Sequence, residues 1–153
     1  MSIKPIIRPV TPQDLEALAD MVRHLARFHG DVPSVTTATL ARDCLGQAPW
    51  LHVLVAEVNE ALCGYAMLFP LARAQHGERG MDLHHLYVHK GLRGLGIGRA
   101  LVRASEALAA RLNARFLTVS AVQENDVAGQ TYLSLGFEEA PNTARRFRRE
   151  LPG

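Results

Sequence analysis

The stretch GLRGLGIGRALVRA, residues 91–104, constrains the fold of this chain more than any other part of its sequence. Four glycines stand in its first eight positions, and an amphipathic helical pattern follows them directly. Glycines allow a backbone to approach a phosphate closely, and the N-terminus of a helix favours negative charge. The pattern therefore predicts a strand-to-helix loop that can hold a phosphate group.

Hydrophobic spacing and turn residues predict a mixed sheet in a single α/β domain, residues 1–153. Strands are expected at residues 5–10, 50–58, 62–69, 81–89, 115–122 and 143–151. Helices are expected from a Thr11 cap to Gly30, at about 36–45, from Ile97 to Asn113 and from Asp126 to Gly136. The strands between residues 50 and 89 run antiparallel, with a hairpin turn at Asn59-Glu60 and a polar loop at 74–80. The later strands belong to strand–helix–strand units, so the sheet is mixed.

Composition excludes several classes of function. The chain has 153 residues, of which 48% are hydrophobic and 21% charged, as is ordinary for one globular domain. Its net charge of +2 is too small to indicate a nucleic-acid partner. The sequence has no apolar run that could span a membrane and no signal-peptide pattern, so we expect a cytoplasmic protein without a membrane partner. Cys44 and Cys63 lack metal-ligand spacing and the histidines are scattered, so no metal is predicted.

The glycine loop does not match two common phosphate-binding motifs. A Walker A loop ends in Gly-Lys followed by Ser or Thr, whereas Gly98 is followed by Arg99 and Ala100. A dinucleotide-binding fingerprint that starts at Gly94 would need a glycine where Arg99 stands. On the residues alone, a glycine-rich turn that binds no ligand remains an alternative.

Two motifs in the chain resemble those of the GNAT superfamily of acetyl-CoA-dependent N-acetyltransferases. The first runs from Arg93 to Gly98 and fits the family pattern of Arg or Gln, two residues, Gly, one residue, then Gly or Ala. The second lies in residues 121–139 and consists of Asn125, Ala128, Tyr132, Gly136 and Phe137. Taken alone, the second motif could be two core aromatics and a helix C-cap. The resemblance implies a GNAT fold, with a mixed sheet of six to seven strands, about four helices, and splayed strands four and five.

The resemblance also implies which residues bind acetyl-CoA as co-substrate. The backbone of the loop would hold the pyrophosphate through Arg93, Gly94, Leu95, Gly96, Ile97, Gly98 and Arg99. The pantetheine arm would pair with Leu86, Tyr87 and Val88, and the Val88 amide would polarise the thioester carbonyl. Asn125 and Ala128 match coenzyme-binding positions, and Tyr132 matches the general acid that protonates the leaving thiolate.

Longer segments, including IIRPVTPQDLEALADMVRHLARF and LHHLYV, resemble the spermidine/spermine and thialysine N-acetyltransferase branch. This resemblance implies a cytoplasmic homodimer that acetylates a small-molecule amine. Members of the branch that act on polyamines often carry a Glu-Asp pair where this chain has His84-His85. Two histidines cannot replace carboxylates around a polycation, so polyamine specificity is not expected.

His84 is the predicted general base, because an imidazole can accept a proton from an ammonium group near neutral pH. Strand alternation places Leu86 and Val88 on the same side as His84, unless a β-bulge reverses it. The alternatives are that His84 is a solvent-exposed strand residue, or that Asp82 or an ordered water serves as the base. The chain could also acetylate a protein α-amine or lysine, or sense acyl-CoA without catalysis.

The C-terminal segment ARRFRRE, residues 144–150, has four arginines in five positions. We interpret it as an exposed strand edge whose charges prevent aggregation. A subunit interface or a site for an anionic substrate is the alternative.

Overall fold

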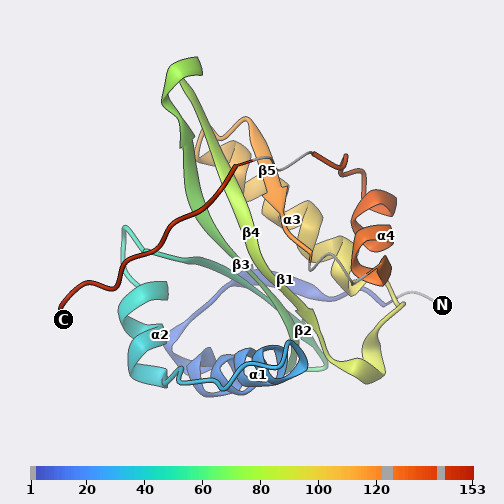
Figure 1. Cartoon of the computed structure of the whole chain (residues 1–153). Coiled ribbons are helices and arrows are strands. Elements are labelled where there is room, and N and C mark those ends of the chain that lie inside the picture. The colour runs from blue at the N-terminus through green and yellow to red at the C-terminus, as the bar shows by residue number, and fades with distance from the viewer. Residues whose placement is uncertain (1–2, 122–125, 141–143) are drawn as a thin grey trace. The chain divides into compact units, whose positions relative to one another are not determined.

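The computed structural model describes residues 3–121, 126–140 and 144–153. The chain forms two compact units, Met1–Ser120 and Ala121–Gly153. The first contains the β-sheet and helices α1 to α3, and the second contains helix α4 and the C-terminal segment (Figure 1).

The first unit is built on one sheet of mixed direction. In the described residues its strands are β1 (Ile6–Pro9), β2 (His52–Val58), β3 (Ala61–Arg73), β4 (Glu78–Val88) and β5 (Phe116–Val119). They lie side by side in chain order, with β1 to β4 antiparallel and β5 parallel to β4. The mixed α/β sheet is confirmed, but the described strands number five where six to seven were expected.

The missing strand is the one expected at 143–151. Residues 144–151 form no strand, and their side chains are exposed. The arginines of this segment are engaged locally: Arg145 lies over the ring of Phe147, and Arg148 forms an ion pair with Glu150. Because these charged side chains remain in water, the segment would bury little apolar area by pairing with a sheet. The hydrophobic effect therefore gives it little reason to form a strand.

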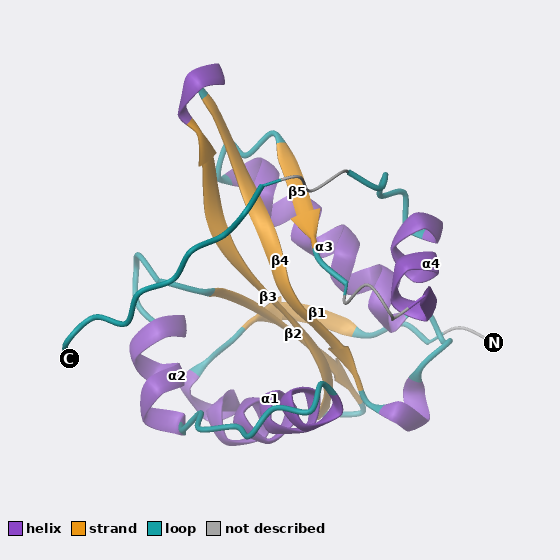
Figure 2. Cartoon of the chain, viewed as in Figure 1, coloured by secondary structure: helices purple, strands orange, loops and turns teal. Residues whose placement is uncertain are grey.

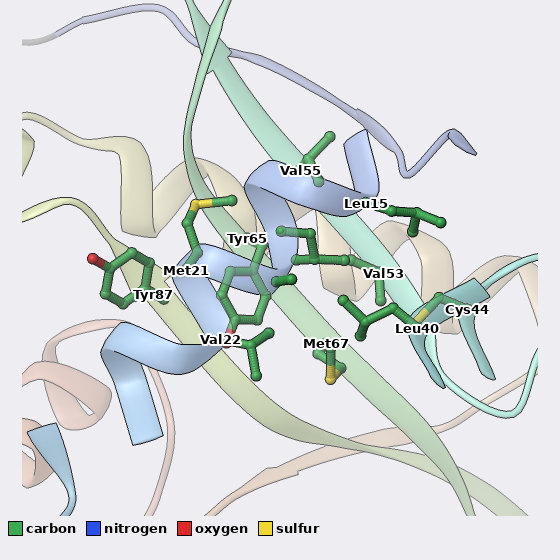
Figure 3. Close-up of a cluster of buried hydrophobic side chains, with 12 residues drawn as sticks. Leu15, Met21, Val22, Leu40, Cys44, Val53, Val55, Tyr65, Met67 and Tyr87 are labelled. Atoms are coloured by element: carbon green, nitrogen blue, oxygen red, sulfur yellow. The ribbon is translucent and has the colours of Figure 1, made fainter. Parts of the chain in front are cut away.

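Helices cover both faces of this sheet. Helices α1 (Leu15–Phe28) and α2 (Thr37–Cys44) lie on one face, and α3 (Ile97–Arg111) lies on the other (Figure 1). A cluster of buried hydrophobic side chains lies beneath α1 and α2, and Figure 3 shows Tyr65 in the middle of it. Its sheet residues are Val53, Val55, Tyr65, Met67 and Tyr87. The residues between these, which point to the opposite face of β2 to β4, face α3. Because both faces of these strands are buried, the strands are almost entirely apolar.

The link from β1 to α1 follows the sequence-based prediction. Pro12–Asp14 form a 3-10 turn that leads into α1, and the Asp14 carboxylate accepts from the Thr11 backbone N–H at 2.7 Å. Asp14 is 6% exposed, and the Arg8 guanidinium binds it at 2.7 and 2.9 Å while also reaching Glu57. Hydrogen bonding to Arg8 lowers the pKa of Asp14 to about 2, so this carboxylate stays charged where it is buried.

The β3–β4 hairpin is longer than predicted, and Figure 2 shows it extending beyond the neighbouring strands. The predicted loop at 74–80 shrinks to a 3-10 turn at Ala74–His76 and Gly77, whose φ is +62°. Polar residues at the tip pair across the hairpin, as Arg73 and Glu78 do at 3.2 Å. The sequence-based prediction took these polar residues for a loop. That was wrong because residues at a hairpin tip can pair across the two strands without being buried.

The second unit contains α4 (Asp126–Ser134). Gly136 follows it with a φ of +97°, and the Phe137 N–H donates to the Tyr132 carbonyl at 3.1 Å. The glycine C-cap expected here is confirmed. Asn125 lies outside the described residues.

Candidate coenzyme and acceptor site

The glycine loop leads directly into the start of α3 and its first backbone N–H groups. Gly94 and Gly96 have φ values of +77° and +93°, a region that favours glycine over other residues. The first helical bond runs from the Ala100 N–H to the Gly96 carbonyl at 3.0 Å. The N–H groups of Ile97, Gly98 and Arg99 thus precede the regular helical bonds, as they do at any helix start that holds an anion. This arrangement fits a pyrophosphate.

Arg93 connects the loop to the end of β4. Its Nε donates to the Val88 carbonyl at 2.8 Å, and its guanidinium lies 5.9 Å from the centre of the Tyr87 ring. On the other side of the loop, the Leu95 carbonyl accepts from the Ile3 N–H at 2.9 Å. The motif arginine therefore stabilises the loop through the protein backbone.

The C-terminal half of β4 presents one free edge in the described residues. The pairing between β4 and β5 ends at Leu83 and Val119. On the opposite edge the His89 N–H donates to the Cys63 carbonyl at 2.8 Å. Because backbone N–H groups alternate between the two edges of a strand, those of Leu86 and Val88 point away from β3. The expected splay of strands four and five is confirmed, and the predicted pantetheine-binding backbone lies where the strands separate.

A β-bulge determines where the two histidines point. Met67 pairs with His85 and Leu68 pairs with Leu83, which leaves His84 as an extra residue on β4. The His84 and His85 rings stack with centroids 4.3 Å apart at 17°, and Phe69 contacts His84 edge-on at 5.4 Å. Met67, Phe69 and His85 belong to the α1 side of the sheet, so His84 points there too. The alternation-based prediction, which placed His84 with Leu86 and Val88, is wrong because of the bulge.

His85 has a buried partner that sequence reasoning missed. The Tyr65 hydroxyl lies 3.0 Å from its Nδ1, and Tyr65 is fully buried. Burial, with smaller contributions from His84 and His29, lowers the pKa of His85 to about 4. Burial also raises the pKa of Tyr65, so both groups are neutral at pH 7. The available signal was a tyrosine in the apolar strand GYAM, next to the predicted antiparallel strand that carries the histidine pair.

Asp82 also lies on the α1 side of β4, two residues before His84. Its Oδ1 accepts from the Thr118 hydroxyl at 2.5 Å, across the last residues at which β4 and β5 pair. This carboxylate, named above as an alternative base, is thus half-buried beside the point where the strands separate.

Tyr132, the predicted general acid, lies on α4 in the second unit. It is half-buried, and its ring contacts Phe137 with centroids 6.0 Å apart. Burial raises the pKa of its phenol, so Tyr132 carries a proton to donate at neutral pH. Ala128 lies on the same helix.

The described residues also bear on metal sites, disulfides and membrane-spanning helices. They contain no group of three His, Cys, Asp or Glu residues placed to hold a metal ion. Cys44 and Cys63 are both buried free thiols. Across the described chain, none of the helices has the length and apolar character needed to cross a bilayer.

Residues 49–139 match the family model described as the acetyltransferase (GNAT) domain. The chain belongs to the GNAT family. It is accordingly an acetyl-CoA-dependent acyltransferase, and the matched residues include both motifs and the β4 edge described above.

Named relatives agree with this family. The chain is 26% identical over 144 residues to a thialysine N-epsilon-acetyltransferase of Sus scrofa, covering 88% of this chain and 84% of the relative. A thialysine N-epsilon-acetyltransferase of Bos taurus is 25% identical over the same coverage.

Solved structures share the fold at lower identity. A probable acetyltransferase has a TM-score of 0.81 at 23% identity, with coverage of 95% of this chain and 99% of that one. An aminoglycoside N-acetyltransferase in complex with CoA has a TM-score of 0.80 at 19% identity, with 95% of each chain covered.

Proposed function

We propose that this GNAT protein transfers the acetyl group of acetyl-CoA to a primary amine of a small molecule, by direct attack in a ternary complex. The observation that carries the proposal is the free edge of β4 at Leu86 and Val88, directly before a helix that starts with unbonded N–H groups. An extended pantetheine arm can pair with the first, and a pyrophosphate can accept from the second.

In this proposal the N–H groups of Gly94 to Arg99 bind the pyrophosphate, and Leu86, Tyr87 and Val88 bind the pantetheine arm through their backbone. Acetyl-CoA supplies an activated thioester. The Val88 amide is our candidate for polarising the thioester carbonyl, and the Leu86 amide shares its edge and is nearer the bulge. A backbone donor aimed at a developing oxyanion is worth about 10²–10³ in rate. Asn125 and Ala128 are further proposed coenzyme contacts.

His84 is the proposed general base and Tyr132 the proposed general acid. His84 is exposed on the α1 side of the sheet, where an incoming amine can reach its ring. The half-buried Tyr132 phenol retains its proton at neutral pH and can deliver it to the leaving thiolate.

The acceptor is proposed from the relatives' names and from the site. Relatives are named for thialysine, and structural neighbours for aminoglycosides, both of which carry primary amines. The His84-His85 pair contributes no carboxylate, which favours an amine without the dense charge of a polyamine. As in the branch that the chain resembles, we further propose a cytoplasmic homodimer.

The test is a panel of amines, including amino acids with side-chain amines, diamines, aminoglycosides and an N-terminal peptide, with release of free thiol as the readout. Turnover of small amines above the acetyl-CoA hydrolysis rate supports the proposal. Preference for the peptide would instead indicate a protein N-acetyltransferase. Coenzyme binding with no turnover of any amine would indicate an acyl-CoA sensor.

A further inference from the structure

The side chain of His84 is held from two sides although it is exposed. Its ring lies between Phe69, at 5.4 Å, and His85, at 4.3 Å and nearly parallel. An exposed histidine on a strand ordinarily samples several rotamers, and fixing it costs conformational entropy. Stacking of this kind is a weak interaction, so fold stability alone gives little reason to fix the ring.

The partner ring is itself fixed by a buried hydrogen bond. Tyr65 is fully buried within the α1 cluster, and its hydroxyl reaches the His85 Nδ1 at 3.0 Å. A hydroxyl buried in an apolar core costs free energy unless it is hydrogen-bonded, and phenylalanine would fill the same space without that requirement. The Tyr65 hydroxyl therefore finds its hydrogen-bond partner in His85, the ring on which His84 stacks.

The charge state of this pair suits a positioning role. Burial keeps His85 neutral at pH 7, so no second imidazolium lies against the His84 ring. Among the described residues, Tyr65 from β3 and His29, which follows α1, lie near His85, while Tyr87 and Asp82 belong to the same strand as the two histidines. Asp82 is hydrogen-bonded to Thr118, and Tyr87 to His89.

We propose that Tyr65 and His85 are positioning residues: Tyr65 orients His85, and His85 holds the His84 ring where it meets the acceptor amine. This inference rests on the proposed function, since it takes His84 as the general base. It assigns no direct contact with substrate to Tyr65. Misplacing a catalytic group by about 1 Å can cost up to 10²-fold in rate, which sets the scale of the expected effect.

The test is a double-mutant cycle on Tyr65→Phe and His84→Ala, using the full chain and whichever amine the panel shows to be acetylated fastest. We expect Tyr65→Phe to lower kcat about 10- to 100-fold, with the dissociation constant for acetyl-CoA unchanged. We expect it to change kcat by less than about twofold when His84 is already Ala, because coupled residues are not additive. His85→Phe, which keeps a ring but loses Nδ1, should behave like Tyr65→Phe.

The pH profile separates positioning from simple stability. The acid limb of kcat/KM that an imidazole base produces should persist in Tyr65→Phe at a lower plateau and vanish in His84→Ala. Ser105→Ala is the matched control, because it also removes a buried hydroxyl hydrogen bond, from Ser105 Oγ to the Leu101 carbonyl at 2.8 Å, but on α3. It should leave kcat unchanged.

The possible failures are distinguishable. If His84→Ala loses activity while Tyr65→Phe keeps wild-type kcat, or adds its full effect in both backgrounds, the positioning role is wrong and the proposed function stands. If His84→Ala keeps full activity and its acid limb, His84 is not the base and the positioning role falls with it. If the wild-type protein acetylates no amine, the proposed function itself is wrong.

Discussion

The substitution Gly64→Ala, on the strand next to β4, should weaken acetyl-CoA binding. Gly64 lies on β3 opposite Val88, and a Cβ atom at this position would stand 2.5 Å from the Tyr87 carbonyl oxygen. Real Cβ contacts are not that short, and the obstructing atom belongs to the backbone, which cannot turn aside as a side chain can. Strand β4 must therefore move at Tyr87 and Val88, the segment proposed to pair with pantetheine.

The size of the effect follows from overpacking and from lost hydrogen bonds. Inserting a methyl group into a packed interior costs about 1–3 kcal/mol, which corresponds to a fall in Tm of about 2–12 °C for a chain of this size. If the two amides on the free edge lose good geometry, at about 1 kcal/mol each, the dissociation constant for acetyl-CoA should rise about 10- to 30-fold.

Calorimetric titration with acetyl-CoA and thermal unfolding of the same sample measure the two effects. Gly91→Ala is the matched control, since a Cβ there meets no atom within 4 Å and no positive φ is involved. It should change neither quantity measurably. An affinity for acetyl-CoA equal to wild type in a Gly64→Ala protein with a lowered Tm would refute the placement of the pantetheine arm along β4.

Three further predictions concern the loop, the acid and an ion pair. Gly96→Val should weaken acetyl-CoA binding at least about tenfold, because a β-branched residue is strained at a φ of +93° and would block the approach of the phosphate. Titration calorimetry on a folded variant measures this change. Tyr132→Phe should lower kcat by about 10²–10⁴ with little change in coenzyme affinity, and a kcat within about twofold of wild type would make Tyr132 a core aromatic. Asp14 has a folded pKa of about 2 against an ordinary 3.8, so its contribution of about 2 kcal/mol is complete above pH 4 and is lost as the pH falls towards 2. Urea unfolding of Asp14→Asn should show that deficit at pH 7 and little of it near pH 2.

Local chemistry was readable from the sequence wherever it decides a structure on its own. The Thr11 and Asp14 capping box, the Asn59-Glu60 turn with its positive φ values, and the glycine loop before α3 are all set by a few adjacent residues. The loop lies between β4 and α3, where the sequence places it, for the same reason.

Features that depend on the opposing strand were not readable. The length of the β3–β4 hairpin depends on pairing between polar residues such as Arg73 and Glu78. The Tyr65–His85 hydrogen bond depends on which residue of β3 faces which residue of β4. Neither the hairpin length nor this contact can be predicted from the residue pattern of one strand alone.

The bulge at His84 shows what a single uncounted residue does to the site. Without it, alternation would place His84 and His85 on opposite faces, and bringing His84 to the α1 side would require every later residue of β4 to turn over. Tyr87 would then leave the core, where it is 8% exposed, and the Leu86 and Val88 amides would turn towards β3. With the extra residue, both histidines face the α1 side while Tyr87 stays buried and the two amides keep the free edge. The unpaired residue therefore lets one strand carry the proposed acceptor side and the proposed coenzyme edge together. Alternation misplaces His84 alone among these four residues, because Leu86, Tyr87 and Val88 follow ordinary alternation after the bulge.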